Sequence, residues 1–117
     1  MTGPFFESLH AAFERQYRDL AKASDQLAER IRTLGFYALA SCSRFNRMSQ
    51  VKESDGVPRA RAMVEELIRG HEAVIRRART LVPAAGKAED HGTADLVIRR
   101  LAVHEKAAWM LRSLLHP

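Results

Sequence analysis

The 117-residue sequence has few of the residues that strand-rich or cross-linked proteins need. It contains six glycines, four prolines and 7% aromatic residues, whereas sandwiches and barrels require many turn residues. Its single cysteine, Cys42, excludes an internal disulfide and fits a reducing compartment. Because Cys42 lies between two serines with no histidine nearby, we interpret it as a small core residue rather than a catalytic thiol.

Long apolar runs are also absent. No segment approaches the roughly 20 apolar residues of a membrane span, and no charged-then-apolar leader opens the chain. The sequence therefore predicts a cytoplasmic protein without a membrane partner. Hydrophobic residues amount to 46%, which is enough for one helical core.

The formal net charge of +5 favours anionic partners such as nucleic acid. Acidic and basic residues are interspersed, however, as at Glu65, Glu66 and Arg69. No recognisable nucleic-acid-binding module accompanies the charge. We therefore interpret most of it as solvated helix surface, with non-specific DNA binding as the alternative.

Apolar residues recur mostly at steps of three and four, the spacing of amphipathic helices. The pattern predicts a long helix over 4–34 that Gly35 ends, and a shorter helix over 36–50. Two further long helices are predicted. One runs from 55–58 to 83–86, where Pro83 and Gly86 are expected to stop it, and the other runs from Asp90 to the end. Short connections between long helices indicate an antiparallel bundle in one domain, 1–117.

A row of metal-ligating side chains lies beside the apolar stripe of the first predicted helix. At about 100° per residue, its four members fall within an arc of roughly 100°. Imidazole and carboxylate groups are ligands that suit ferrous iron. Pairs four residues apart are also common on solvated surfaces, so an ordinary wet helix face is the alternative. The row consists of His10, Glu14, Asp25 and Glu29.

The spacing within this row favours a site shared by two chains. Its two pairs are 15 residues apart, or about 22 Å along a helix, too far for one site in one chain. His10 with Glu29, and Glu14 with Asp25, share one midpoint in the sequence. Two copies packed antiparallel about a two-fold axis would place His10 opposite the partner's Glu29 and Glu14 opposite the partner's Asp25. One dimer would then carry two equivalent metal sites.

Several segments resemble the mini-ferritin (Dps) family of the ferritin-like superfamily. Segment 3–10, Gly-Pro-Phe-Phe-Glu-Ser-Leu-His, resembles the family's lead into its second bundle helix. Segment 25–30 resembles its Asp-x-x-Ala-Glu-Arg signature, and 92–96 with 104–112 resemble its final helix. The resemblance runs through nearly the whole chain.

This resemblance implies an all-α, ferritin-like antiparallel four-helix bundle with the first helix missing, which leaves three long helices plus one short connecting helix. It implies two-fold dimers assembled into a hollow dodecamer. It also implies oxidation of Fe(II) between subunits, preferably by hydrogen peroxide, storage of the Fe(III) mineral, and DNA protection at the nucleoid. His10 and Glu14 match one subunit's ligands, and Asp25 and Glu29 match those of the facing subunit.

The chain departs from the family pattern in two ways. Glu14 stands where the family usually has aspartate, so the carboxylate reaches further and changes the metal geometry. The family's first helix, a further ligand histidine in a His-Trp motif and a lysine-rich tail would all precede Met1. A start codon placed too far downstream and a truncated protein both remain open. Without that helix, an apolar face is expected to be exposed.

Other residues are interpreted as structural. His71 and His104 are expected to be packed, hydrogen-bonded core residues. Asp95 resembles the acid lining the family's three-fold pore, and stabilising a helix start is the alternative. Trp109 is interpreted as an interior or interface anchor. Five arginines are interpreted as solvated surface, with DNA phosphate contacts as the alternative: Arg76, Arg77, Arg79, Arg99 and Arg100.

Three functional hypotheses follow. The leading one is an iron-oxidising and iron-storing subunit, a ferroxidase if its ligand site is completed. The second is a catalytically silent helical interaction protein derived from the same family. The third is a basic DNA-binding protein without redox activity.

Overall fold

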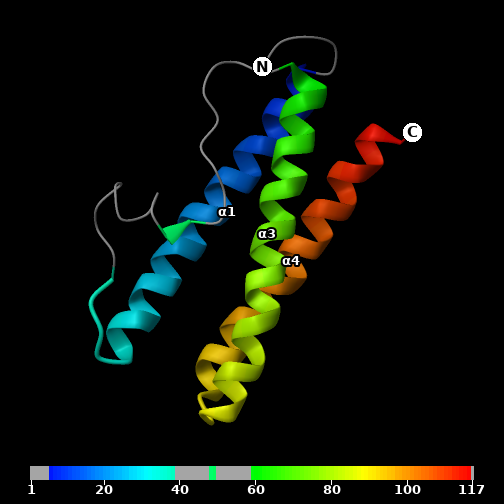
Figure 1. Ribbon diagram of the computed structural model, residues 1–117. Helices are drawn as coiled ribbons and strands as arrows, with labels where there is room; N and C mark the ends of the chain where they lie inside the picture. Colours follow the sequence, from blue (N-terminus) through cyan, green and yellow to red (C-terminus); the bar gives the residue numbers. More distant parts are fainter. Residues whose placement is uncertain (1–5, 39–47, 50–58, 117) are drawn as a thin grey trace. The chain divides into compact units, whose positions relative to one another are not determined.

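The computed structural model describes residues 6–38, 48–49 and 59–116, and this part of the chain contains helices and no strand (Figure 1). The long helices are α1, Phe6–Thr33, α3, Ala60–Lys87, and α4, His91–Leu115. They confirm the predicted all-α class and three long helices. Of the short helix predicted over 36–50, residues 36–38 are not helical. Most of its remainder, with Cys42, lies outside the described residues.

The chain divides into two units, Met1–Ala60 with α1 and Arg61–Pro117 with most of α3 and all of α4. Within the second unit, α3 and α4 run antiparallel, as two ion pairs between them show. Glu72 contacts Arg112, whereas Arg79, further along α3, contacts Glu105, further back along α4. This antiparallel pair is the expected result of a short connection between long amphipathic helices.

Gly35 ends α1, as predicted. Its φ is +95°, a left-handed conformation that costs a residue with a side chain about 1–2 kcal/mol. The amide of Gly35 donates to the carbonyl of Arg32, and that of Phe36 donates to the carbonyl of Ile31. These two bonds form a Schellman motif, which satisfies carbonyls that the helix leaves unpaired.

Helix α3 ends one residue beyond the predicted range of 83–86. Pro83 lies inside the helix, and α3 continues past Gly86 to Lys87. Proline removes the bond to the carbonyl of Arg79, and its ring crowds that carbonyl. Helix α3 nevertheless continues for one more turn, and its end is well capped. The cap is a second Schellman motif, in which the amide of Asp90 donates to the Ala85 carbonyl and that of Glu89 to the Gly86 carbonyl.

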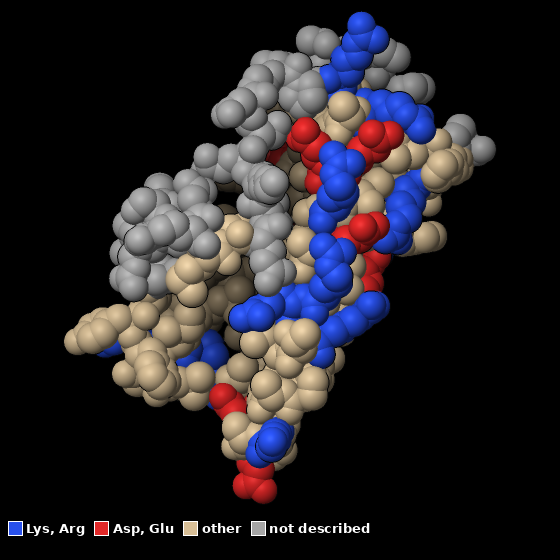
Figure 2. Space-filling model, viewed as in Figure 1, with Lys and Arg blue, Asp and Glu red and all other residues tan. Residues whose placement is uncertain are grey.

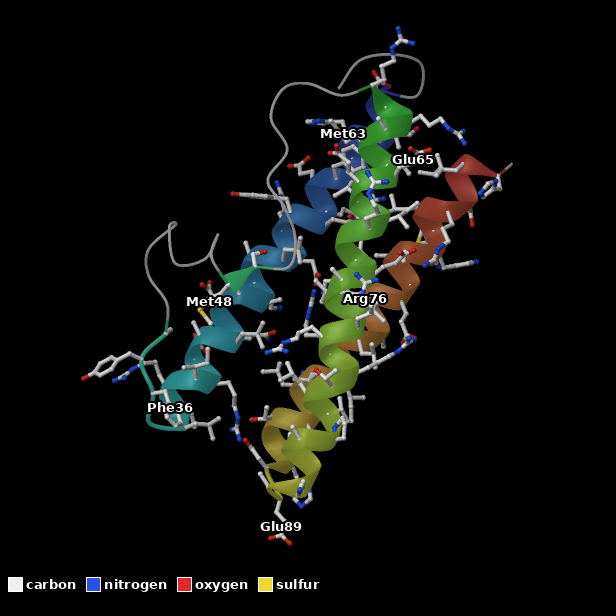
Figure 3. All side chains as sticks on the ribbon, viewed as in Figure 1. Phe36, Met48, Met63, Glu65, Arg76 and Glu89 are labelled. Carbon is white, nitrogen blue, oxygen red and sulfur yellow. The ribbon has the colours of Figure 1, made fainter. Side chains whose placement is uncertain are left out.

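Glu89, rather than a glycine, takes the left-handed position of this cap, with φ of 58°. Its side chain extends away from both helices at the turn (Figure 3). Asp90 then starts α4, as predicted: its carboxylate accepts hydrogen bonds from the amide and the hydroxyl of Thr93. Because an N-cap side chain satisfies helix amides, this contact defines where α4 begins.

The two caps predict opposite responses to similar substitutions. Gly35→Ala is expected to lower the free energy of unfolding by about 1–2 kcal/mol, since alanine must adopt the left-handed conformation. Glu89→Gly is expected to raise it by up to about 1 kcal/mol, because it removes that strain. Urea denaturation followed by circular dichroism measures both. Changes of the same sign at the two positions would contradict this account.

The second unit buries small and branched apolar side chains from both of its helices. They recur along α3 and α4 mostly at steps of three and four residues, as the sequence pattern predicted. Among them Leu111 is 2% exposed and Ala108 is fully buried. The others are Val64, Ile68, Ala73, Ile75, Ala78, Ala85, Leu96 and Val97.

Large apolar side chains also lie in solvent. On α1 these include Tyr17, Leu20 and Leu27, in line with the expected exposed apolar face. Trp109 on α4 is 62% exposed, so the interior position considered for it is wrong. Indole is amphipathic and tolerates a solvated site when no partner covers it. Among the described helices, none is both long and apolar enough to cross a lipid bilayer.

Candidate metal centre

The continuous helix α1 carries all four predicted ligands. His10, Glu14, Asp25 and Glu29 are each exposed. The buried described side chains of this helix are Leu9 and Ala23, which lie on the opposite side of its axis at the helical periodicity. The ligand row is therefore a solvent-facing surface of α1.

Two of these carboxylates are available for a metal ion. The side chain of Asp25 has no hydrogen-bond or ion-pair partner within the described part of the chain. Glu29 accepts a bond from the Thr33 hydroxyl only through its main-chain carbonyl, at 2.8 Å. Glu14 contacts Arg18 at 2.7 Å, with the two side chains 49% and 76% exposed. Such an exposed pair contributes about 0–1 kcal/mol, which a metal ion can displace.

One chain does not bring the two ligand pairs together. The described residues contain no group of three or more His, Cys, Asp or Glu side chains placed to hold one metal ion. This follows from the helix, since 15 residues of α1 separate the pairs by about 22 Å. The donor types suit Fe(II), whereas the number within reach in one chain does not.

Asp95 is exposed and forms an ion pair with Arg99 at 3.1 Å on the outer surface of α4. Asp90 caps the helix start and the first turn of α4 holds no acidic residue, so the alternative that Asp95 stabilises the helix start was wrong. The prediction that five arginines of α3 and α4 lie on solvated surface is confirmed for the four that are exposed: Arg76, Arg77, Arg79 and Arg99.

The two histidines predicted to be structural form a buried pair that the sequence did not reveal. His71 of α3 and His104 of α4 are 7% and 3% exposed, and their Nδ1 atoms lie 2.9 Å apart. Their ring centroids are 5.1 Å apart with a 50° tilt. Arg100, which we had interpreted as solvated, reaches the Nε2 atom of His104 at 2.9 Å.

Arg100 determines which histidine donates. A guanidinium group has donors only, so Nε2 of His104 must accept. The proton of a neutral His104 then resides on Nδ1, which donates to Nδ1 of His71. The hydrogen bonds therefore run in one direction, from Arg100 to His104 and from His104 to His71, and they link α4 to α3.

Comparison with known proteins places the chain among ferritin-like proteins. The ferritin-like domain matches residues 1–116. An uncharacterized low temperature-induced protein of Nostoc is 43% identical over 115 residues, which cover 97% of this chain and 64% of that protein. DNA protection during starvation protein 2 of Bacillus anthracis is 32% identical over 114 residues, covering 97% and 78%. The chain thus spans less than two thirds of the Nostoc relative.

Solved structures agree with this placement. Dps from Staphylococcus aureus matches with a TM-score of 0.96 at 32% identity, over 99% of this chain and 78% of that one. Dps from Vibrio cholerae O1, described as a member of a broad superfamily of ferritin-like diiron-carboxylate proteins, matches with a TM-score of 0.94 at 34% identity, over 98% and 72%. The fold is therefore that of the ferritin-like four-helix bundle. These matches show that the chain belongs to the Dps family of ferritin-like proteins.

Proposed function

We propose that this chain, as one ferritin-like domain over 1–117, is a subunit of an iron-oxidising and iron-storing mini-ferritin. Fe(II) is its substrate and binds between two chains. The observation that carries the proposal is the solvent-facing row on α1, whose members pair about one midpoint: His10, Glu14, Asp25 and Glu29. The diiron-carboxylate description of the Vibrio cholerae relative supports it.

The remainder of this face suits an antiparallel second copy. About the same midpoint, Glu7 would lie opposite the partner's Arg32, and Arg18 opposite the partner's Ala21. The first pairing joins opposite charges, and the second places a long side chain over a short one. A two-fold axis repeats each pairing, so favourable contacts occur twice per dimer.

The ligand chemistry accounts for Fe(II) binding and oxidation. The imidazole of His10 supplies a neutral nitrogen, and the carboxylates offset the charge of the metal, which increases as Fe(II) becomes Fe(III). Hydrogen peroxide takes one electron from each of two Fe(II) ions and, with two protons, yields two water molecules and two Fe(III) ions. Because both electrons are transferred, no hydroxyl radical is released.

DNA protection would follow from the same chemistry, because it removes both Fe(II) and peroxide. The Bacillus anthracis relative is named for DNA protection during starvation. Assembly of dimers into a dodecamer, a cytoplasmic location and non-specific contact with DNA through the net charge of +5 belong to this proposal.

Anaerobic titration with Fe(II), followed by addition of hydrogen peroxide, tests the proposed activity. We expect saturable binding and an ultraviolet absorbance of Fe(III) when peroxide is added. Glu66→Gln removes an exposed carboxylate from α3 and should leave both unchanged. A dimer or larger species that neither binds nor oxidises Fe(II) would reject the proposal and favour the silent interaction protein. DNA binding that persists without metal and falls with salt would favour the third hypothesis.

A further inference from the structure

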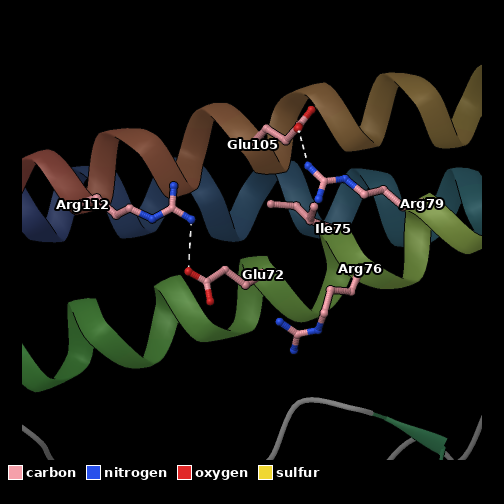
Figure 4. A pocket seen from close by; sticks show the side chains of 6 residues that line it. All are labelled: Glu72, Ile75, Arg76, Arg79, Glu105 and Arg112. Carbon is pink, nitrogen blue, oxygen red and sulfur yellow. Dashed lines mark hydrogen bonds and ion pairs between the residues drawn. The ribbon is translucent and has the colours of Figure 1, made fainter.

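A cleft lies between α3 and α4 on the second unit, well away in sequence from the ligand row of α1. Its volume is about 270 Å³, and both helices contribute to its walls (Figure 4). Ile75, which is buried, supplies an apolar side chain to the lining. The other lining residues are charged: Glu72, Arg76, Arg79, Glu105 and Arg112.

Both glutamates of this cleft are already neutralised by ion pairs between the helices. Glu72 accepts from Arg112 at 3.1 Å, and Glu105 accepts from Arg79 at 3.0 Å. Each arginine uses one terminal nitrogen in these bonds, and a guanidinium group carries five N–H donors. The paired arginines therefore keep donors that a further acceptor can use.

Arg76 is different, because its side chain has no hydrogen-bond or ion-pair partner among residues 6–38, 48–49 and 59–116. Along α3 it lies between Glu72 and Arg79, and in Figure 4 its guanidinium points to the side of the helix away from both ion pairs, without a bond to either glutamate. Three arginines against two glutamates leave the cleft with one excess positive charge. A metal cation is disfavoured there, and an anion is favoured.

We propose that this cleft binds a phosphate group, with Arg76 as its main ligand and with Arg79 and Arg112 as additional donors. Planar guanidinium groups bind oxyanions through two parallel N–H bonds. When the exposed Arg76 side chain turns toward the cleft that it lines, donors from both helices surround one hollow. Such a set of donors suits the several oxygens of a tetrahedral phosphate better than the two of a carboxylate. Binding of phosphate to Arg76 is favourable because no existing ion pair must be broken before the new contact forms.

The phosphate group has two sources, free inorganic phosphate or the phosphodiester backbone of a nucleic acid. Lys and Arg side chains form a band over the face that carries α3 (Figure 2). On α3 outside the cleft lining, the side chains of Arg69 and Arg77 also have no hydrogen-bond or ion-pair partner in the described part of the chain. A polyanion would use the band, whereas free phosphate would use the cleft alone.

Calorimetric titration of the full chain with sodium phosphate at constant ionic strength tests the proposal. Arg76→Gln is expected to weaken phosphate binding about tenfold, the loss of a charge-assisted bidentate contact. Arg77→Gln is the matched control, since it removes the same charge one residue along α3 without lining the cleft, and it should change binding less than twofold. No binding by the unaltered chain up to about 20 mM phosphate, or equal losses in both variants, would overturn the proposal.

A duplex DNA oligonucleotide distinguishes the two sources. If Arg76→Gln weakens duplex binding and inorganic phosphate competes with the duplex, the cleft takes a backbone phosphate. If duplex binding is unchanged while phosphate binding falls, the cleft takes the free ion. If neither probe depends on Arg76 although the variant keeps its circular dichroism spectrum, the cleft is only a junction of two ion pairs and the proposal is wrong.

Discussion

Two inactive variants of this chain, mixed and allowed to exchange subunits, are expected to regain about a quarter of the Fe(II) oxidation of the unaltered protein. One variant carries His10→Ala and Glu14→Gln, and the other carries Asp25→Asn and Glu29→Gln. Each homodimer lacks half the ligands of both of its sites and should oxidise Fe(II) at least about a hundredfold more slowly, because metal affinity requires the full ligand set.

The mixture recovers activity because each site draws on both chains. In a mixed dimer, one site receives all four altered residues and the other receives all four natural ones. Random exchange makes about half of the dimers mixed, and each has one intact site of two, which gives the expected quarter. A site contained within one chain would give no recovery, since every chain in the mixture is defective.

Stopped-flow measurement of Fe(III) formation after addition of peroxide measures the recovery. Gel filtration should show that both variants remain dimeric or larger, so that inactivity reflects lost ligands rather than lost assembly. Mixing each variant with the Glu66→Gln control should restore only the activity that this control contributes. Activity of the mixture no greater than that of the separate variants would contradict a shared site.

The buried histidine pair gives the second large effect. His71→Leu removes the acceptor of the bond that His104 donates, and it is expected to lower the free energy of unfolding by about 2–3 kcal/mol. His104→Leu leaves Nδ1 of His71 and the Arg100 donor without their partner and is expected to cost a similar amount. The double variant should lose about 1–3 kcal/mol less than the sum of the two, because no histidine is then left unpaired.

Urea denaturation of the four proteins of this cycle gives the coupling free energy. The ion pair between Glu72 and Arg112 provides a comparison, since it joins the same helices but its side chains are 38% and 49% exposed. Its cycle should give a coupling below about 1 kcal/mol. Additive losses for His71 and His104 would show that their hydrogen bond does not stabilise the folded chain.

Local rules were sufficient where one helix determines the outcome. The apolar spacing predicted α1 and α4, Gly35 predicted the end of α1, and Asp90 predicted the start of α4. Pro83 and Gly86 predicted an end of α3 slightly before the observed one. The end of a helix also depends on which residue can adopt the left-handed conformation that lets the last carbonyls be hydrogen-bonded. Glu89 takes the left-handed position after α3 although it has a side chain, and glutamate has no preference for that conformation from which this could have been predicted.

Pairings between helices were not predictable in the same way. The burial of His71 and His104 was predicted from their apolar neighbours. The bond between them was not, because 33 residues separate the two and the register of α3 against α4 is a tertiary property. The ligand row of α1 is the reverse case: its symmetry can be read from the sequence, and its completion requires a second chain.

Asp90 serves two helices at once, closing α3 with its amide and starting α4 with its carboxylate. Only residues 88–90 separate Lys87 from His91, so little chain entropy is lost when the two helices first meet. Contacts near this turn join residues close in sequence, and such contacts form early in folding. We therefore expect the α3–α4 hairpin to form before contacts between residues that are further apart in the sequence.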